Sequence, residues 1–107
     1  MNLDYAGKVV VLTGAASGIG KGLALAFAQQ GAELELLDRN AVALEAVADE
    51  LSALTSVTFA TLDLADSTAI AAYAARREGR AIDVLVNNAG VEYVTPLSDT
   101  GAAADAH

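Results

Sequence analysis

The sequence contains no cysteine, a single proline and few aromatic residues, and these shortages exclude several classes of protein. Without cysteine, the chain cannot form disulfides, bind zinc through thiolates or use a thiol nucleophile. Basic residues are scarce as well, because 6 Lys and Arg stand against 14 Asp and Glu, for a formal charge of −8. This charge predicts no general attraction for nucleic acid or for anionic membrane surfaces.

Long apolar runs are also missing, although 54% of the residues are hydrophobic. The longest runs, such as residues 23–28, fall far short of the roughly 18 apolar residues that span a bilayer. Asp4 lies where a secretory signal peptide would carry basic residues. These features predict a globular, cytoplasmic chain, and its 107 residues allow one domain.

Continuous apolar runs alternate with helical patterns along the chain. The expected strands are residues 8–12, 34–38, 57–62 and 82–86. Runs without polar alternation are typical of strands buried on both faces of a parallel sheet. Strands that alternate with helices predict right-handed crossovers and a Rossmann-type α/β fold, here four strands in the order 3-2-1-4 with three helices. Residues 91–107 are expected to form a loop and the start of a further helix.

Apolar spacing predicts which side of each helix faces the sheet. Capping residues are expected at Asn40 for the second helix and at Asp66 or Ser67 for the third, which should run to about Glu78. The residues expected to face inward are Ile19, Leu23 and Phe27; Leu44, Val47, Leu51 and Leu54; and Ile70, Tyr73 and Ala74. Two charged groups are expected at the surface, Glu33 and Glu35 on the second strand and the basic residues Arg76, Arg77 and Arg80.

A glycine-rich turn follows the first strand, with Gly14, Gly18 and Gly20 before the first helix. Glycines permit a tight turn, and the free N–H groups of a helix start attract an anion such as a diphosphate. A P-loop is excluded, because its leading glycine would fall on Ala15 and Gly22 follows Lys21 where a hydroxyl residue is needed. The turn instead has the pattern Thr-Gly-x-x-x-Gly-x-Gly.

Acidic residues close the second and third strands. Asp38 comes 24 residues after Gly14, a spacing at which a carboxylate can accept hydrogen bonds from ribose hydroxyls and repel a 2′-phosphate. This favours NAD, while Arg39 leaves NADP open because a guanidinium could hold the 2′-phosphate. Asp63 lies at the same sheet edge and could bind the ligand or cap a helix.

With these motifs and the run Ile-Asp-Val-Leu-Val-Asn-Asn-Ala-Gly over residues 82–90, the chain resembles the short-chain dehydrogenase/reductase family from about residue 8 to residue 90. The resemblance implies that an NAD(P) cofactor binds here, with phosphate and adenosine ribose at Gly14, Ser17, Gly18 and Ile19. It implies ribose contacts from Asp38, adenine contacts from Asp63 and Leu64, and a cofactor cleft lined by Asn88, Ala89 and Gly90. Asn87 would help to fix the strand.

The same resemblance implies catalysis by a Tyr-x-x-x-Lys pair and a serine, and no residue of this chain matches them. Four residues after Tyr5, Tyr73 and Tyr93 come Val9, Arg77 and Leu97. Residues 1–107 are therefore expected to form a partial domain, the cofactor-binding half of an oxidoreductase that acts on a hydroxyl or carbonyl substrate. The alternatives are a non-catalytic module that binds NAD or ADP-ribose, and an inactive fragment. The fourth strand predicts an open edge, to be covered by a second copy or another partner.

Overall fold

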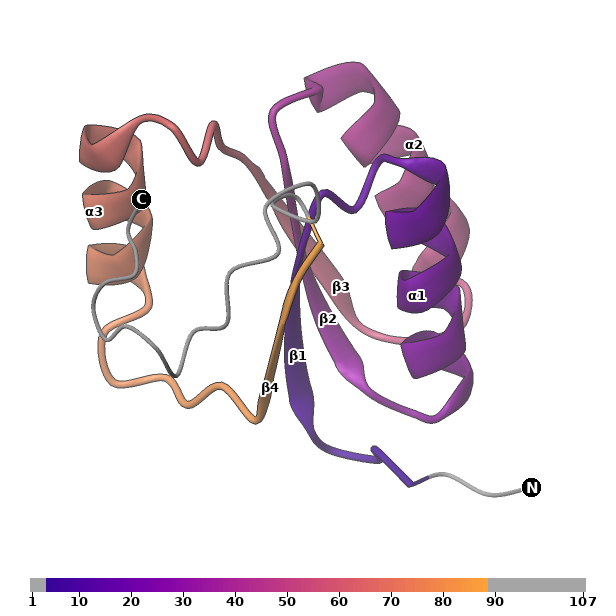
Figure 1. The fold of residues 1–107 in the computed structure, drawn as a ribbon. Helices are drawn as coiled ribbons and strands as arrows, with labels where there is room; N and C mark the ends of the chain where they lie inside the picture. The colour runs from indigo at the N-terminus through magenta and orange to yellow at the C-terminus, as the bar shows by residue number, and fades with distance from the viewer. Residues whose placement is uncertain (1–3, 89–107) are drawn as a thin grey trace.

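Residues 4–88 are described by a computed structural model, which has the expected α/β architecture (Figure 1). In chain order the elements are β1 (Val9–Thr13), α1 (Gly18–Gln29), β2 (Glu33–Asp38), α2 (Ala41–Leu51), β3 (Val57–Thr61), α3 (Ser67–Arg76) and β4 (Val84–Asn87). The strands are all parallel in the order β3-β2-β1-β4, which confirms the predicted Rossmann-type sheet. Helices α1 and α2 cover one face and α3 lies on the other. Within residues 4–88, no helix is long and apolar enough to cross a membrane.

Small residues bring α1 close to the sheet. Its buried positions are Gly20, Ala24 and Ala28, which recur at every fourth residue. The predicted inward stripe was therefore displaced by one residue: Ile19 is 66% exposed, and Leu23 and Phe27 pack only at the margin of the core. A stripe without bulky side chains permits close approach of helix and sheet, and the larger residues then fill the flanks.

The second helix follows its predicted face more closely. Leu44, Val47 and Leu51 are buried, and Asn40 caps the helix by accepting a hydrogen bond from the N–H of Ala43. Leu54 was wrongly placed in the core, because α2 ends at Leu51 and leaves Leu54 exposed. The alternating residues of β1 and β2, among them Leu12 and Leu36, complete this main core.

Helix α3 packs loosely, contrary to the expectation of an apolar inner face. None of its residues is buried: Ile70 and Ala74 are exposed and Tyr73 is half-buried. The helix ends at Arg76, two residues before the predicted end, and the next turn closes at Gly79, whose φ of 85° suits glycine. Within residues 4–88, its apolar contacts belong to a small cluster with Val11, Leu37 and Leu62 at its centre.

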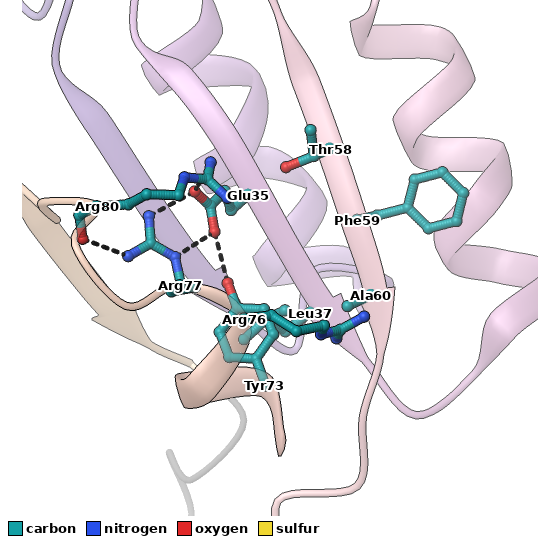
Figure 2. A pocket seen from close by; sticks show the side chains of 9 residues that line it. All are labelled: Glu35, Leu37, Thr58, Phe59, Ala60, Tyr73, Arg76, Arg77 and Arg80. Carbon is teal, nitrogen blue, oxygen red and sulfur yellow. Dashed lines mark hydrogen bonds and ion pairs between the residues drawn. The ribbon is translucent and has the colours of Figure 1, made fainter. Parts of the chain in front are cut away.

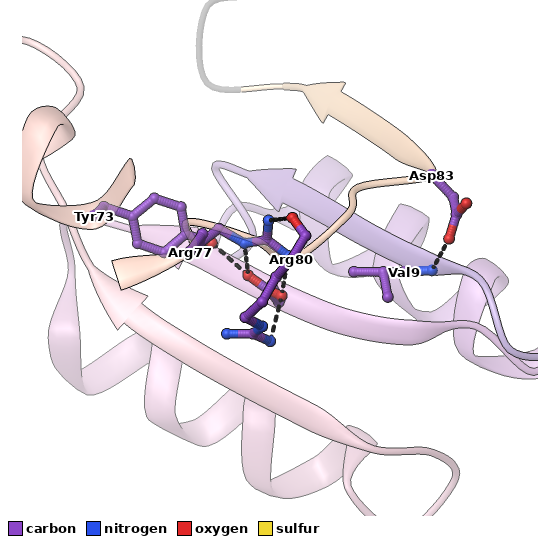
Figure 3. A network of polar contacts seen from close by, with 6 residues as sticks. Val9, Tyr73, Arg77, Arg80 and Asp83 are labelled. Carbon is purple, nitrogen blue, oxygen red and sulfur yellow. Dashed lines mark hydrogen bonds and ion pairs between the residues drawn. The ribbon is translucent and has the colours of Figure 1, made fainter. Parts of the chain in front are cut away.

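A buried ion pair joins α3 to the sheet instead, so the surface positions predicted for Glu35 and Arg77 were wrong. Glu35 is 6% exposed and Arg77 is 7% exposed. Arg77 donates from Nε to Glu35 Oε1 at 2.6 Å and from Nη2 to Oε2 at 2.5 Å (Figure 2, which labels both residues; Figure 3 gives a second view). The side chains of Tyr73 and Arg80 also donate to this carboxylate, at 2.6 and 3.0 Å. The sheet is covered on both faces, so a residue that alternates with Leu34 and Leu36 points into the α3 layer rather than into water.

Hydrogen bonding fixes the ionisation of this group. The bonds donated by Arg77 hold the pKa of the Glu35 carboxyl below its ordinary value, despite the opposing effect of burial. The same bonds raise the pKa of Arg77.

The strand β4 begins at Val84 rather than at residue 82. The carboxylate of Asp83 accepts a hydrogen bond from the Val9 N–H at 2.8 Å and so fixes the start of this strand (Figure 3).

Replacing Glu35 by Gln is expected to lower the free energy of unfolding by about 3–5 kcal/mol, because Arg77 is left as a buried charge without its counterion. Glu33→Gln is the matched control, since Glu33 lies exposed two residues away on β2 and should cost less than about 0.5 kcal/mol. Urea unfolding followed by circular dichroism measures both. Equal losses in the two variants would show that the pair does not hold α3.

The contribution of Glu35 to the free energy of unfolding should also depend on pH. Because the folded-state pKa lies below its ordinary value of 4.5, the contribution is complete above that value and is lost as the pH falls through the lowered pKa. The difference in unfolding free energy between the wild type and Glu35→Gln should therefore be largest near neutral pH and shrink in acid. A difference that grows as the pH falls below neutrality contradicts the assignment.

Candidate functional site

The turn between β1 and α1 presents free backbone donors. Gly14 has a φ of 66°, which turns the chain at the end of β1. Ser17 caps α1: its Oγ accepts from the Gly20 N–H at 3.0 Å and donates to the Gly14 carbonyl at 2.8 Å. The N–H groups of Gly18 and Ile19 have no hydrogen-bond acceptor within residues 4–88. Such orphan donors at the positive end of a helix dipole are suited to an anion.

The glycines of this turn differ in the space around them. A Cβ on Gly20 would lie 2.0 Å from the carbonyl oxygen of Gly14, so this position must be glycine for α1 to start where it does. A Cβ on Gly18 would meet nothing within 4 Å. Gly20 therefore serves the packing of the turn, while Gly18 faces the open side where a ligand can approach the backbone.

Asp38 lies beside the turn at the end of β2. Its Oδ2 accepts from the Ala16 N–H and its Oδ1 from the Asn40 N–H, both at 2.9 Å. A carboxylate offers about four acceptor positions, so each oxygen retains capacity for a ribose hydroxyl. Arg39, the next residue, is exposed.

Asp63 and Leu64 follow β3 at the same edge of the sheet. The Leu62 N–H donates to the Asp38 carbonyl at 2.9 Å, which keeps this segment beside Asp38. Asp63 is not the cap of α3: its Oδ1 accepts from the Ala65 N–H, whereas Asp66 accepts from the first turn of the helix. Leu64 is 38% exposed and offers an apolar surface.

The end of β4 is tied to the same turn. The side-chain amide of Asn88 donates to the Gly14 carbonyl at 3.2 Å and to Ser17 Oγ at 3.1 Å. Asn87 Oδ1 accepts from the Thr13 hydroxyl at 3.0 Å, in line with the role expected for Asn87.

The structure brings nine of the eleven expected site residues to one sheet edge, and the other two, Ala89 and Gly90, lie outside the described residues. The nine are Gly14, Ser17, Gly18, Ile19, Asp38, Arg39, Asp63, Leu64 and Asn88.

Sequence reasoning missed two contributors to this edge. The Ala16 N–H and the Thr13 hydroxyl both brace the turn, the first against Asp38 and the second against Asn87. A backbone donor carries no signal in the residue type. The position of Thr13 directly before Gly14 is a signal that could have pointed to the second contact.

Tyr73 lies away from this edge, on the opposite side of the sheet from α1. Burial and its hydrogen bond to Glu35 raise the pKa of Tyr73 to about 12. The hydroxyl therefore stays protonated near neutral pH and serves as a donor to Glu35. Among residues 4–88, no group of three or more His, Cys, Asp or Glu side chains is placed to hold a metal ion.

Comparison with known proteins agrees with this geometry. Residues 8–105 match the family described as short chain dehydrogenase. The chain belongs to this family. Among its relatives, retinol dehydrogenase 12 of Mus musculus is 39% identical over 111 residues, which covers 99% of this chain and 35% of the relative. Oxidoreductase UcpA of Salmonella typhimurium is 47% identical over 89 residues, covering 79% of this chain and 33% of the relative.

Solved structures of the short-chain dehydrogenase family superpose on the same region. Hydroxysteroid dehydrogenase from Escherichia coli has a TM-score of 0.72 and 35% identity, and the match covers 80% of this chain and 38% of that one. L-Sorbose reductase from Gluconobacter frateurii, in a complex with NADPH and L-sorbose, has a TM-score of 0.74 at 35% identity, covering 84% and 36%. The chain thus spans about a third of the length of the curated relatives that it matches.

The contrast between two glycines tests the geometry of the turn. Gly20→Ala should destabilise the protein by about 1–3 kcal/mol, because the new methyl group collides with the Gly14 carbonyl. Gly22→Ala, in the same helix with open space around its Cβ, should stabilise it by about 0.5–1 kcal/mol through helix propensity. Thermal or urea unfolding gives both values, and effects of the same sign would refute the assigned packing.

Proposed function

We propose that this chain binds the adenosine diphosphate part of a nicotinamide dinucleotide at the edge formed by the ends of β1, β2 and β3. The observation that carries the proposal is the pair of N–H groups of Gly18 and Ile19, which have no hydrogen-bond acceptor within residues 4–88. The space beside Gly18 is open, and the hydrogen bond from the Ala16 N–H to Asp38 lies only two residues before Gly18 in the chain. Backbone donors can bind a diphosphate without any basic side chain, which suits a chain with a charge of −8.

The adenosine would lie across the neighbouring strand ends. Asp38 would accept hydrogen bonds from the ribose hydroxyls, and Asp63 and Leu64 would flank the adenine. Ile19 and Leu64, 66% and 38% exposed, supply apolar surface for this contact. Asn88, with Ala89 and Gly90, would line the cleft toward the nicotinamide.

NAD is the preferred cofactor in this proposal. The Asp38 carboxylate would repel the 2′-phosphate of NADP, while the exposed Arg39 guanidinium opposes that preference. NADP is used within the family, as the NADPH complex of L-sorbose reductase illustrates. The choice between the cofactors therefore depends on the balance of two adjacent side chains.

In the complete protein, this region would serve hydride transfer between the cofactor and a hydroxyl or carbonyl substrate. Residues 1–107 would then form a partial Rossmann domain, with substrate contacts supplied by the rest of the fold. The cytoplasmic location and the partner that covers the edge of β4 remain predictions. A chain that acts alone as a non-catalytic NAD or ADP-ribose module is the second candidate, since the proposed nucleotide contacts lie within residues 14–90.

Calorimetric titration of the 107-residue chain tests the proposal. NAD and ADP-ribose should bind at millimolar concentrations with similar affinity, because the proposed contacts are to the part that they share. Gly18→Ala should weaken both at least tenfold, about 1.4 kcal/mol, by obstructing the approach of the phosphates. Gly22→Ala is the matched control and should leave both affinities unchanged. No binding by the folded wild-type chain refutes the proposal.

Asp38→Asn tests the cofactor preference separately. Removal of the negative charge should weaken NAD binding and strengthen NADP binding. The affinity for NAD relative to that for NADP should therefore fall by roughly tenfold or more. A structural defect would weaken both cofactors together. If NADP already binds the wild type more tightly than NAD, Arg39 outweighs Asp38 and the NAD assignment is wrong.

A further inference from the structure

A second concave site lies on the opposite face of the sheet from α1, beneath α3. It is a solvent-open cavity of about 190 Å³, and its lining includes Arg76, Arg77 and Arg80 (Figure 2). Only 6 residues of the chain are Lys or Arg, so half of its basic residues line one cavity of a strongly acidic protein. The positive charge of this chain is thus concentrated at one cavity.

The ion pair described above accounts for only part of that charge. Glu35 is the acidic residue of the lining, and Arg77 neutralises it through two hydrogen bonds. All three nitrogens of Arg77 already donate within the protein, because Nη1 donates to the Arg80 carbonyl at 3.0 Å. One carboxylate among three guanidinium groups leaves a local excess of two positive charges.

The other two arginines retain donors for a ligand. The Arg80 side chain is 59% exposed and makes one contact to Glu35 through Nη2, at 3.0 Å. The Arg76 guanidinium lies 5.7 Å from the centre of the Tyr73 ring, and no carboxylate within residues 4–88 forms an ion pair with it. Both side chains lie at the cavity, where Figure 2 shows Arg76 extended along the ring toward Ala60.

Apolar groups form most of the remaining wall, which also includes Thr58. Leu37 and Ala60 lie side by side on β2 and β3, and the Tyr73 ring faces them from α3. The volume suffices for one small ring, since a cavity of roughly 150 Å³ accommodates benzene. The cavity thus combines an apolar surface with two cationic groups. This combination suits a ligand that carries a carboxylate on a small hydrocarbon body.

We infer that the cavity beneath α3 is a binding site for a small carboxylic acid with an aromatic or short aliphatic body, separate from the nucleotide edge. The carboxylate binds Arg76 and Arg80, and the hydrocarbon body contacts Leu37, Ala60 and the Tyr73 ring. This site does not depend on the proposed cofactor function, because it shares no residue with the turn or with the ends of the strands.

Benzoate is a suitable probe, with benzyl alcohol as its uncharged counterpart and inorganic phosphate as an anion without a hydrocarbon body. In an NMR titration of the folded 107-residue chain, benzoate should shift the signals of Leu37, Ala60 and Tyr73 and should not be displaced by ADP-ribose. Benzyl alcohol and phosphate should each bind at least about fivefold more weakly. Equal binding of either one, or benzoate shifts confined to residues 14–20, would overturn the inference.

Two variants identify the charges involved. Arg76→Gln and Arg80→Gln should each weaken benzoate binding about fivefold or more. Arg76→Gln is the sharper test, because Arg76 makes no contact with Glu35 and its loss leaves the buried ion pair intact. Lys8→Gln removes an exposed positive charge outside the cavity and should leave the affinity unchanged. Unchanged affinity in Arg76→Gln, or an equal loss in Lys8→Gln, contradicts the assignment.

Discussion

The close contact between the start of α1 and the Gly14 carbonyl is the constraint on which the candidate site depends. Gly20 has no room for a Cβ there, and the stripe of Ala24 and Ala28 continues the close approach along the helix. This packing places the N-terminus of α1 directly over the end of β1. The free N–H groups of Gly18 and Ile19 thereby reach the edge where the other parallel strands also end, beside Asp38 and Asn88.

The meeting of the candidate site residues at one sheet edge was predictable from the sequence because its determinants are local. The glycine spacing, the acid that closes β2 and the Asn-Asn pair at the end of β4 are each local in the sequence, and the parallel order of strands brings them together. The inward face of α1 was less predictable. Its periodicity in large apolar residues pointed to Ile19, whereas the small residues one position later are the ones that touch the sheet.

The α3 layer was the part that local patterns could not reveal. Glu35 and Arg77 are 42 residues apart, and each alone is typical of a solvated surface. A signal was present in β2, where a charged residue alternates between Leu34 and Leu36 on a strand expected to be buried on both faces. A buried glutamate needs a cation, but the sequence does not say which of the arginines supplies it. That choice follows from where α3 ends and how the next turn folds.

The edge of the sheet and the face beneath α3 offer different kinds of hydrogen-bond donor to an anion. At the nucleotide edge, the donors are backbone N–H groups, which do not enter the net charge of −8. Beneath α3, the donors are guanidinium groups, partly neutralised by Glu35. The two proposed sites would let an acidic protein bind anions by two different means.

The most direct test of the central claim is the amide proton shift of Gly18 and Ile19 on addition of ADP-ribose, with adenosine as the control. Diphosphate bound by these N–H groups should shift both amide signals downfield, while adenosine, which lacks phosphates, should leave them nearly unchanged. Binding of ADP-ribose without a shift at Gly18 and Ile19, or equal shifts with adenosine, would contradict the account of this turn as a phosphate site.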